Sequence, residues 1–233
     1  MTASVDERRT LIARNATMLV FAVNGFAFAS WMSRVPDVRE ALALTPGELG
    51  LLLLAISAGA LCGLPLAGRV THHIGAQATV RVGMGLMVPG LVLAAIAVEA
   101  NAGMFWVVPG LFLVGLGSGV WDVAQNVEGT IVERALGRAI MPWFHAGFSG
   151  GTVLGALIGA GMTALRVPVV AHLVTVAVLS ALTLWWGTLR FLPAFGETED
   201  APKAPARGKS AWLEPRTLLI GLMVLAAAFT EGT

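Results

Sequence analysis

The stretch GMFWVVPGLFLVGLGSGVWDVAQNV, residues 103–127, decides the fold class of this chain. Its only charged residue is Asp122, and it is longer than the about 20 apolar residues that a helix needs to cross a bilayer core. The backbone must satisfy its own hydrogen bonds in lipid, which leaves helices and closed barrels as spanning structures. The apolar residues are continuous and lack the alternation of barrel strands. The stretch is therefore predicted to be a transmembrane helix.

Similar apolar segments recur along the whole chain. Of its 233 residues, 56% are hydrophobic and only 12% are charged, whereas soluble domains carry about 25% charged residues. The sequence therefore predicts an all-α membrane protein, a bundle of six transmembrane helices plus the start of a seventh. The further segments cover residues 15–31, 48–68, 79–98, 141–165, 168–189 and 217–233.

The longest connection between these segments divides the chain. Residues 192–216 contain four prolines and mixed charge, which is the composition of a polar linker. We therefore expect a six-helix bundle over residues 1–191, a linker over 192–216, and the first part of helix seven over 217–233. Since the last apolar segment stops at Thr233, the chain is expected to be the first part of a longer protein.

The positions of Lys and Arg predict the orientation. With the N-terminus in the cytoplasm, twelve basic residues lie on the cytoplasmic side and three, Arg34, Arg39 and Arg166, lie outside. The basic N-terminus followed by an apolar run also resembles a signal peptide, with Ala27–Ala29 as a cleavage site. The length of the first segment and the segments that follow favour a retained helix.

Charge and cysteine content exclude several other functions. Fifteen Lys and Arg balance fourteen Asp and Glu, so no electrostatic attraction to nucleic acid is expected. The single Cys62 cannot form an intrachain disulfide and excludes a cysteine-based metal cluster. His72 and His73 are adjacent residues, which point apart on a helix and make a poor metal site. The sequence predicts no metal and no cofactor.

Asp122 is the candidate proton-coupling residue. A carboxylate within a membrane helix costs about 2.5–3.5 kcal/mol on insertion scales, so it normally faces a polar interior. Gln125 and Asn126 lie three and four residues further on and share its face. A structural Asp bonded to a neighbouring helix is the alternative interpretation.

Two more polar residues are candidates for a substrate pathway together with Gln125 and Asn126. Asn24 lies near the middle of the first segment, where its amide is suited to bond either a substrate hydroxyl or a neighbouring helix. His145 lies a few residues into segment 141–165, and antiparallel packing places it at a depth similar to that of Asp122. A packing histidine is the equal alternative.

Three motifs resemble those of a known family. They are WDVAQN at residues 121–126, FHAGFSGG at residues 144–151, and Trp31-x-x-Arg34-x-Pro36. The chain resembles a bacterial subgroup of the major facilitator superfamily with a DVxxN fourth helix and an FHxxFSxGG fifth helix. Residues 68–77 keep the glycine spacing of that superfamily's signature loop, but His72 and His73 replace its Asp-Arg pair. The fucose–proton symporters are more distantly similar, and their fourth-helix acid corresponds to Asp122.

The resemblance implies a secondary active transporter of the bacterial inner membrane. Its two six-helix bundles would rock about a central site, so the expected partners are the lipid bilayer, a small polar solute, a proton, and either the C-terminal half or a second copy of the chain. It implies a symporter and no cofactor. Only the N-terminal half of the family's fold is covered.

Two rival functions belong to other classes. The first is a half-sized membrane scaffold or assembly partner without transport. The second is an intramembrane serine protease, because Gly147-Phe148-Ser149-Gly150 fits a GxSG motif and His172 lies in the next segment. The predicted depths of Ser149 and His172 differ by on the order of 12 Å at the rise of a helix. That separation disfavours the protease, because a catalytic dyad needs hydrogen-bond contact.

Overall fold

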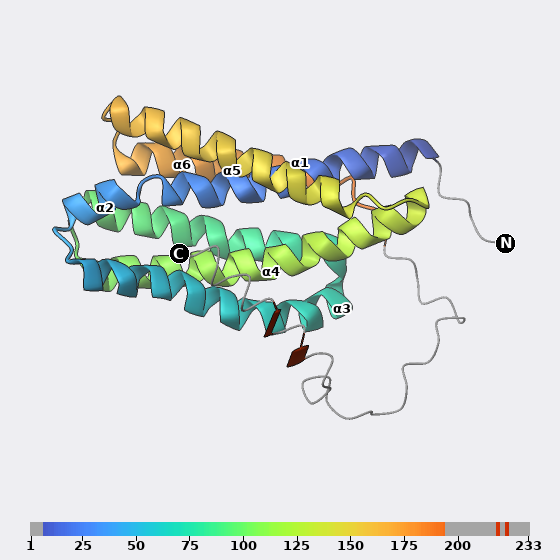
Figure 1. Cartoon of the computed structure of the whole chain (residues 1–233), viewed down its shortest axis with the longest axis horizontal. Helices are drawn as coiled ribbons and strands as arrows, with labels where there is room; N and C mark the ends of the chain where they lie inside the picture. Colours follow the sequence, from blue (N-terminus) through green and yellow to red (C-terminus); the bar gives the residue numbers. More distant parts are fainter. Residues whose placement is uncertain (1–6, 194–217, 220–221, 224–233) are drawn as a thin grey trace. The chain divides into compact units, whose positions relative to one another are not determined.

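The computed structural model of the chain is a helical bundle (Figure 1). It describes residues 7–193, 218–219 and 222–223, and no strand occurs among them. Five helices are long and apolar enough to cross a membrane. The predicted linker and the start of helix seven lie outside the described residues, apart from Leu192, Pro193 and the two short pairs. The helices are α1 (Glu7–Met32), α2 (Val35–Ala41), α3 (Pro46–Glu99), α4 (Met104–Leu136), α5 (Met141–Ala164) and α6 (Val169–Thr188).

The prediction of six separate spanning helices is not matched, because two predicted segments form one helix. Segments 48–68 and 79–98 both lie in α3, which has 54 residues. Its helical geometry is interrupted at Gly75, where φ is 78° and ψ is 164°. Such a conformation is essentially restricted to glycine. The loop expected over residues 68–77 is thus helical except at this one residue, and α3 folds back there as two legs (Figure 1).

Both legs of α3 pack against α4 through glycines. A Cβ at Gly115 or Gly119 would collide with the backbone of Ile56 or Ala60 in the first leg. A Cβ at Gly117 would collide with the backbone of Gly83 in the second leg. Small residues let membrane helices approach closely, and alternate glycines of one α4 stretch therefore contact different legs.

The helix α1 packs against α5 in the same way. A Cβ at Gly151 would collide with the carbonyl oxygen of Ala22, and a Cβ at Gly155 would lie 2.5 Å from that of Phe26. This is the small-residue face of α5 that its four-residue glycine spacing predicts. Two closely packed units result, α3 with α4 and α1 with α5.

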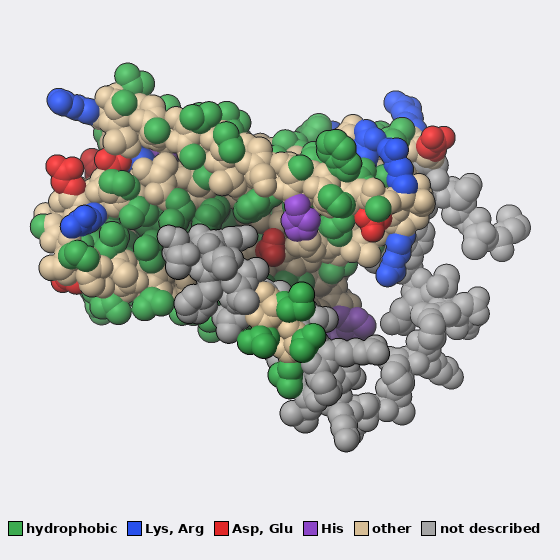
Figure 2. Space-filling view, viewed as in Figure 1, with side chains coloured by type: hydrophobic (Ala, Val, Ile, Leu, Met, Phe, Trp, Pro, Cys, Tyr) green, Lys and Arg blue, Asp and Glu red, His purple; other side chains and the backbone are tan. Residues whose placement is uncertain are grey.

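Charged and hydrophobic side chains are segregated along the bundle. Figure 2 shows most Lys, Arg, Asp and Glu gathered towards its two ends, with hydrophobic side chains and one acid over the middle. Many large apolar residues of the middle are exposed, including Leu61, Val153 and Leu182. An exposed apolar band between charged ends fits a hydrocarbon core between two headgroup layers.

An ion pair between a buried arginine and a partly exposed aspartate joins two turns at the end of the bundle that carries α2. The Nε of Arg34 lies 2.7 Å from Oδ2 of Asp37, and the Arg34 side chain is only 3% exposed. The Nη2 of Arg34 donates to the carbonyl oxygen of Val167 at 2.7 Å, and Thr163 donates to the same Asp37 oxygen at 2.8 Å. The α1–α2 turn is thereby tied to the α5–α6 turn.

A carboxylate fixes the turn between α4 and α5 at the opposite end. Glu133 Oε2 accepts hydrogen bonds from the backbone N–H groups of Ile140 and Met141, at 2.7 and 2.8 Å. These are first-turn amides of α5 that lack partners within the helix. Gly137 closes the turn with a φ of 63°. The geometry of residues 137–141 is therefore held by side-chain bonding and a left-handed glycine.

Candidate functional site

A cavity of about 340 Å³ lies between four helices and contains two of the predicted site residues. Asn24 of α1 and Asp122 of α4 both line it, although they are 98 positions apart in the sequence (122 − 24). The other lining residues are mostly apolar or small. They are Phe28, Ala60, Leu64, Ser118, Gly119 and Phe148.

The carboxylate of Asp122 is held by one neighbour on its own helix. Gln125 donates its Nε2 hydrogen to Asp122 Oδ1 at 2.9 Å. Gln125 is fully buried, so packing fixes its amide, and Asp122 itself is half-buried. No described Lys or Arg forms an ion pair with Asp122. The carboxylate therefore meets a neutral donor and the cavity, with no fixed cation among the described residues.

Asn24 contributes an amide that is unused within the described part of the chain. Its residue is 2% exposed, and none of the described groups forms a hydrogen bond with its side chain. A buried amide normally has hydrogen-bond partners. Asn24 is therefore available to bond a polar molecule inside the cavity.

Asn126 and His145 lie elsewhere. Asn126 donates its side-chain amide to the backbone carbonyl of Asp122 at 2.8 Å, so it bonds its own helix. His145 packs edge-on against Phe21, with ring centroids 5.4 Å apart, and its side chain is exposed. Phe148, three residues further along α5, lines the cavity instead.

Comparison with known proteins supplies the family. Residues 17–231 match the model of the Major Facilitator Superfamily. The chain belongs to the major facilitator superfamily.

Three bacterial proteins are similar to this chain. An uncharacterized transporter, y4wD, of Sinorhizobium fredii is 33% identical over 97% of the chain and 58% of its own length. An uncharacterized MFS-type transporter of Yersinia pestis is 34% identical over 94% of the chain and 54% of its own length. The membrane protein MosC of Rhizobium meliloti is 29% identical over 61% of the chain and 34% of its own length. The chain thus spans little more than half the length of the first two relatives.

This chain also contains a buried acid that the sequence analysis did not identify as a candidate. Glu128 on α4 is fully buried, and its Oε1 accepts the backbone N–H of Leu192 at 2.8 Å, just after α6. Its spacing from Trp121 and Gln125, seven and three residues, places all three on one helical stripe. This shared stripe could have indicated from the sequence that Glu128 is buried, because Trp121 and Gln125 on the same stripe are buried too. Glu128 fixes the exit of α6 against α4.

Ser149 and His172 do not form a protease dyad in this structure. The hydroxyl of Ser149 donates to the carbonyl oxygen of His145 at 3.1 Å, within α5. His172 is 5% exposed, and neither of its ring nitrogens has a hydrogen-bond partner in the described part of the chain. A serine nucleophile requires a base in hydrogen-bond contact.

Proposed function

We propose that this chain forms the N-terminal half of a proton-coupled secondary transporter for a small polar solute. The observation that carries the proposal is the shared cavity of Asn24 and Asp122 within an apolar helical bundle. Ionisable residues inside a membrane bundle mark substrate or ion pathways. The two relatives that are named as transporters and the family membership support the same class.

In this proposal Asp122 exchanges the coupling proton. The carboxylate faces a cavity and has no ion-pair partner among the described residues, so a mobile cation must neutralise it there, and in this proposal that cation is a proton. The bond from Gln125 keeps Oδ1 in place at 2.9 Å. Binding and release of a proton at this position links the cavity to the proton gradient.

The solute binds beside Asp122. Asn24 supplies an amide that both donates and accepts, and Ser118 supplies a hydroxyl to the same cavity. Ligand sites pair a few such groups with apolar walls, here Phe28, Leu64 and Phe148. Gln125, Asn126 and His145 complete the proposed pathway when the second bundle is present. Alternating access then comes from rocking of the two bundles about this cavity.

A reconstitution experiment tests the function. The protein is produced from its complete gene, placed in liposomes loaded with a pH-sensitive dye, and exposed to a panel of small polar solutes. We expect at least one solute to drive proton movement across the liposome membrane, and residues 1–233 alone, as a monomer, to drive none. Proton movement by the monomeric 1–233 form would contradict the half-transporter assignment. A complete protein that binds other membrane proteins but moves no solute would support a scaffold.

The proposed orientation has the N-terminus in the cytoplasm of a bacterial cell, with the chain in the inner membrane. Its support is the excess of basic residues at one end of the bundle. His73 and Asn101 are exposed near opposite ends of the second leg of α3. On a Cys62→Ser background, an impermeant thiol reagent should label Asn101→Cys in intact cells and His73→Cys only after lysis. The reverse pattern would invert the topology.

A further inference from the structure

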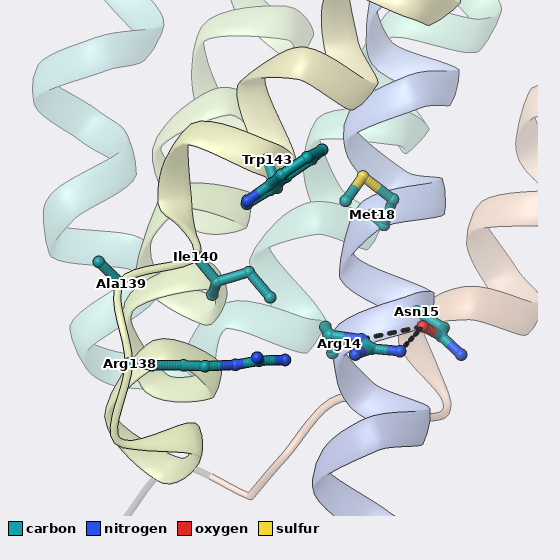
Figure 3. Close-up of a pocket in the computed structure, with 7 residues that line it drawn as sticks. All are labelled: Arg14, Asn15, Met18, Arg138, Ala139, Ile140 and Trp143. Atoms are coloured by element: carbon teal, nitrogen blue, oxygen red, sulfur yellow. Dashed lines mark hydrogen bonds between the residues drawn. The ribbon is translucent and has the colours of Figure 1, made fainter.

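A second cavity lies at the opposite end of α1 from α2, and it is basic. It measures about 420 Å³ and lies between the first part of α1 and the turn that leads into α5. Arg14 of α1 and Arg138 of the turn both line it. Figure 3 shows the Arg138 side chain extending from the turn towards α1, where the Arg14 guanidinium bonds to Asn15. We propose that this cavity binds the phosphate group of an anionic phospholipid.

Neither arginine is neutralised by an acid of the described chain. The Nε and Nη2 of Arg14 donate to Oδ1 of Asn15 at 3.1 and 2.9 Å (Figure 3), which fixes the guanidinium without compensating its charge. Arg138 has no hydrogen bond or ion pair to any described residue. None of the described Asp and Glu residues lines the cavity. Two guanidinium groups that face one cavity repel each other, and an anion between them removes that repulsion.

Glu133 in the last turn of α4 is the acid nearest to Arg138 in the sequence, and it already has hydrogen-bond partners. Glu133 accepts the backbone N–H groups of Ile140 and Met141, and it is not among the lining residues. This bonding also fixes the backbone beside Arg138. The cavity thus has a defined wall on one side and a net positive charge.

The distribution of polar and apolar walls favours a lipid over a free anion. Arg14 and Arg138 come just before the apolar segments 15–31 and 141–165, at the level of the headgroups. Met18 and Trp143 lie about one helical turn deeper along α1 and α5 and line the same cavity (Figure 3). Trp143 is 68% exposed, as is typical of an interfacial aromatic anchor. A phosphate between the arginines would continue into glycerol and acyl chains along Met18 and Trp143.

General membrane electrostatics agree with this assignment. Basic pockets between helices at the membrane surface bind lipid headgroups, and each basic residue near an anionic surface contributes about a fivefold gain in affinity. Removal of both guanidinium groups is therefore expected to weaken lipid binding by about thirtyfold.

Native mass spectrometry of the protein from its complete gene tests the proposal. Phosphatidylglycerol and phosphatidylcholine are titrated onto the wild type and onto Arg14→Gln/Arg138→Gln. We expect the wild type to prefer phosphatidylglycerol and the double variant to lose about thirtyfold in affinity for it. Arg190→Gln is the matched control, because the Arg190 guanidinium already stacks 3.3 Å from the Trp186 ring and donates to the Trp186 carbonyl. Equal phosphatidylglycerol binding by wild type and double variant overturns the proposal, and so does an equal loss in Arg190→Gln.

Two further variants test whether a loss of binding comes from misfolding, and whether the ligand is a lipid or a free phosphate. Arg138→Lys keeps the charge at an exposed position, so it should fold and retain most of the lipid binding. Trp143→Ala should weaken phosphatidylglycerol binding and leave binding of inorganic phosphate unchanged. Displacement of the lipid by inorganic phosphate, with no effect of Trp143→Ala, would instead identify a soluble phosphate as the ligand and overturn the lipid assignment.

Discussion

Asp122→Asn is expected to abolish proton-driven accumulation of the solute while leaving solute exchange between liposomes and medium partly intact. Asn keeps the size of the side chain and can still accept the bond from Gln125, whose Nε2 lies 2.9 Å from Oδ1 in the native protein. It cannot bind and release a proton. The measurement compares uptake against a concentration gradient with counterflow exchange, for the complete protein in liposomes.

The control for this variant removes a carboxylate elsewhere. Glu99 is exposed at the end of α3, so Glu99→Gln should accumulate solute at the wild-type level. Accumulation by Asp122→Asn equal to wild type would show that Asp122 does not carry the coupling proton. Loss of folded protein in Asp122→Asn, detected by size-exclusion chromatography, would favour the structural interpretation of Asp122.

Asp37→Ala is expected to destabilise the bundle strongly. It leaves the Arg34 guanidinium, 3% exposed, with the carbonyl oxygen of Val167 as its only partner among the described residues. Removing one member of a fully buried ion pair typically costs about 3–5 kcal/mol, because the other charge stays buried and unpaired. Asp37 is 24% exposed, so the expected cost lies towards the lower end of that range. The expected result is a clear fall in the midpoint of thermal unfolding in detergent.

Two comparisons identify the unpaired charge as the cause. Glu40 lies on the same short helix, α2, and is exposed, so Glu40→Ala should change the midpoint little. Arg34→Met/Asp37→Ala removes both charges, and its midpoint should lie above that of Asp37→Ala alone. A double variant less stable than the single one would show that Arg34 contributes through packing and its bond to Val167 rather than through charge compensation.

Local patterns predicted much of this molecule, because they need no knowledge of distant residues. Apolar length was enough to predict an all-helical chain with membrane-spanning helices, although not their exact number. The three-residue spacing of Asp122 and Gln125 predicted a shared face, and the structure shows the bond between them. Gly151 and Gly155 are four residues apart and therefore share one face of α5, and that face contacts α1.

Features that depend on how a helix is rotated about its axis, or on contacts between residues far apart in the sequence, could not be predicted in this way. Asn126 shares a face with Asp122, yet its amide bonds the backbone, because a side chain within reach of its own helix has that alternative. The depth of His145 was inferred, but whether it faces the cavity depends on the rotation of α5. The burial of Arg34 depends on Val167, 133 positions away. A local sequence pattern cannot relate two residues that are so far apart.

The single-residue break at Gly75 makes chain length, and not only residue identity, a constraint on this fold. Ordinary loops absorb insertions and deletions at the surface, but here helix continues on both sides of one glycine. One residue gained or lost between Gly75 and Gly83 would rotate the remainder of the second leg by about 100° about its axis. Gly83 and Gly90, which lie against the backbones of Gly117 and Gly110, would then turn away from α4 together. Homologous chains that keep this hairpin should therefore differ in sequence around it far more readily than in length.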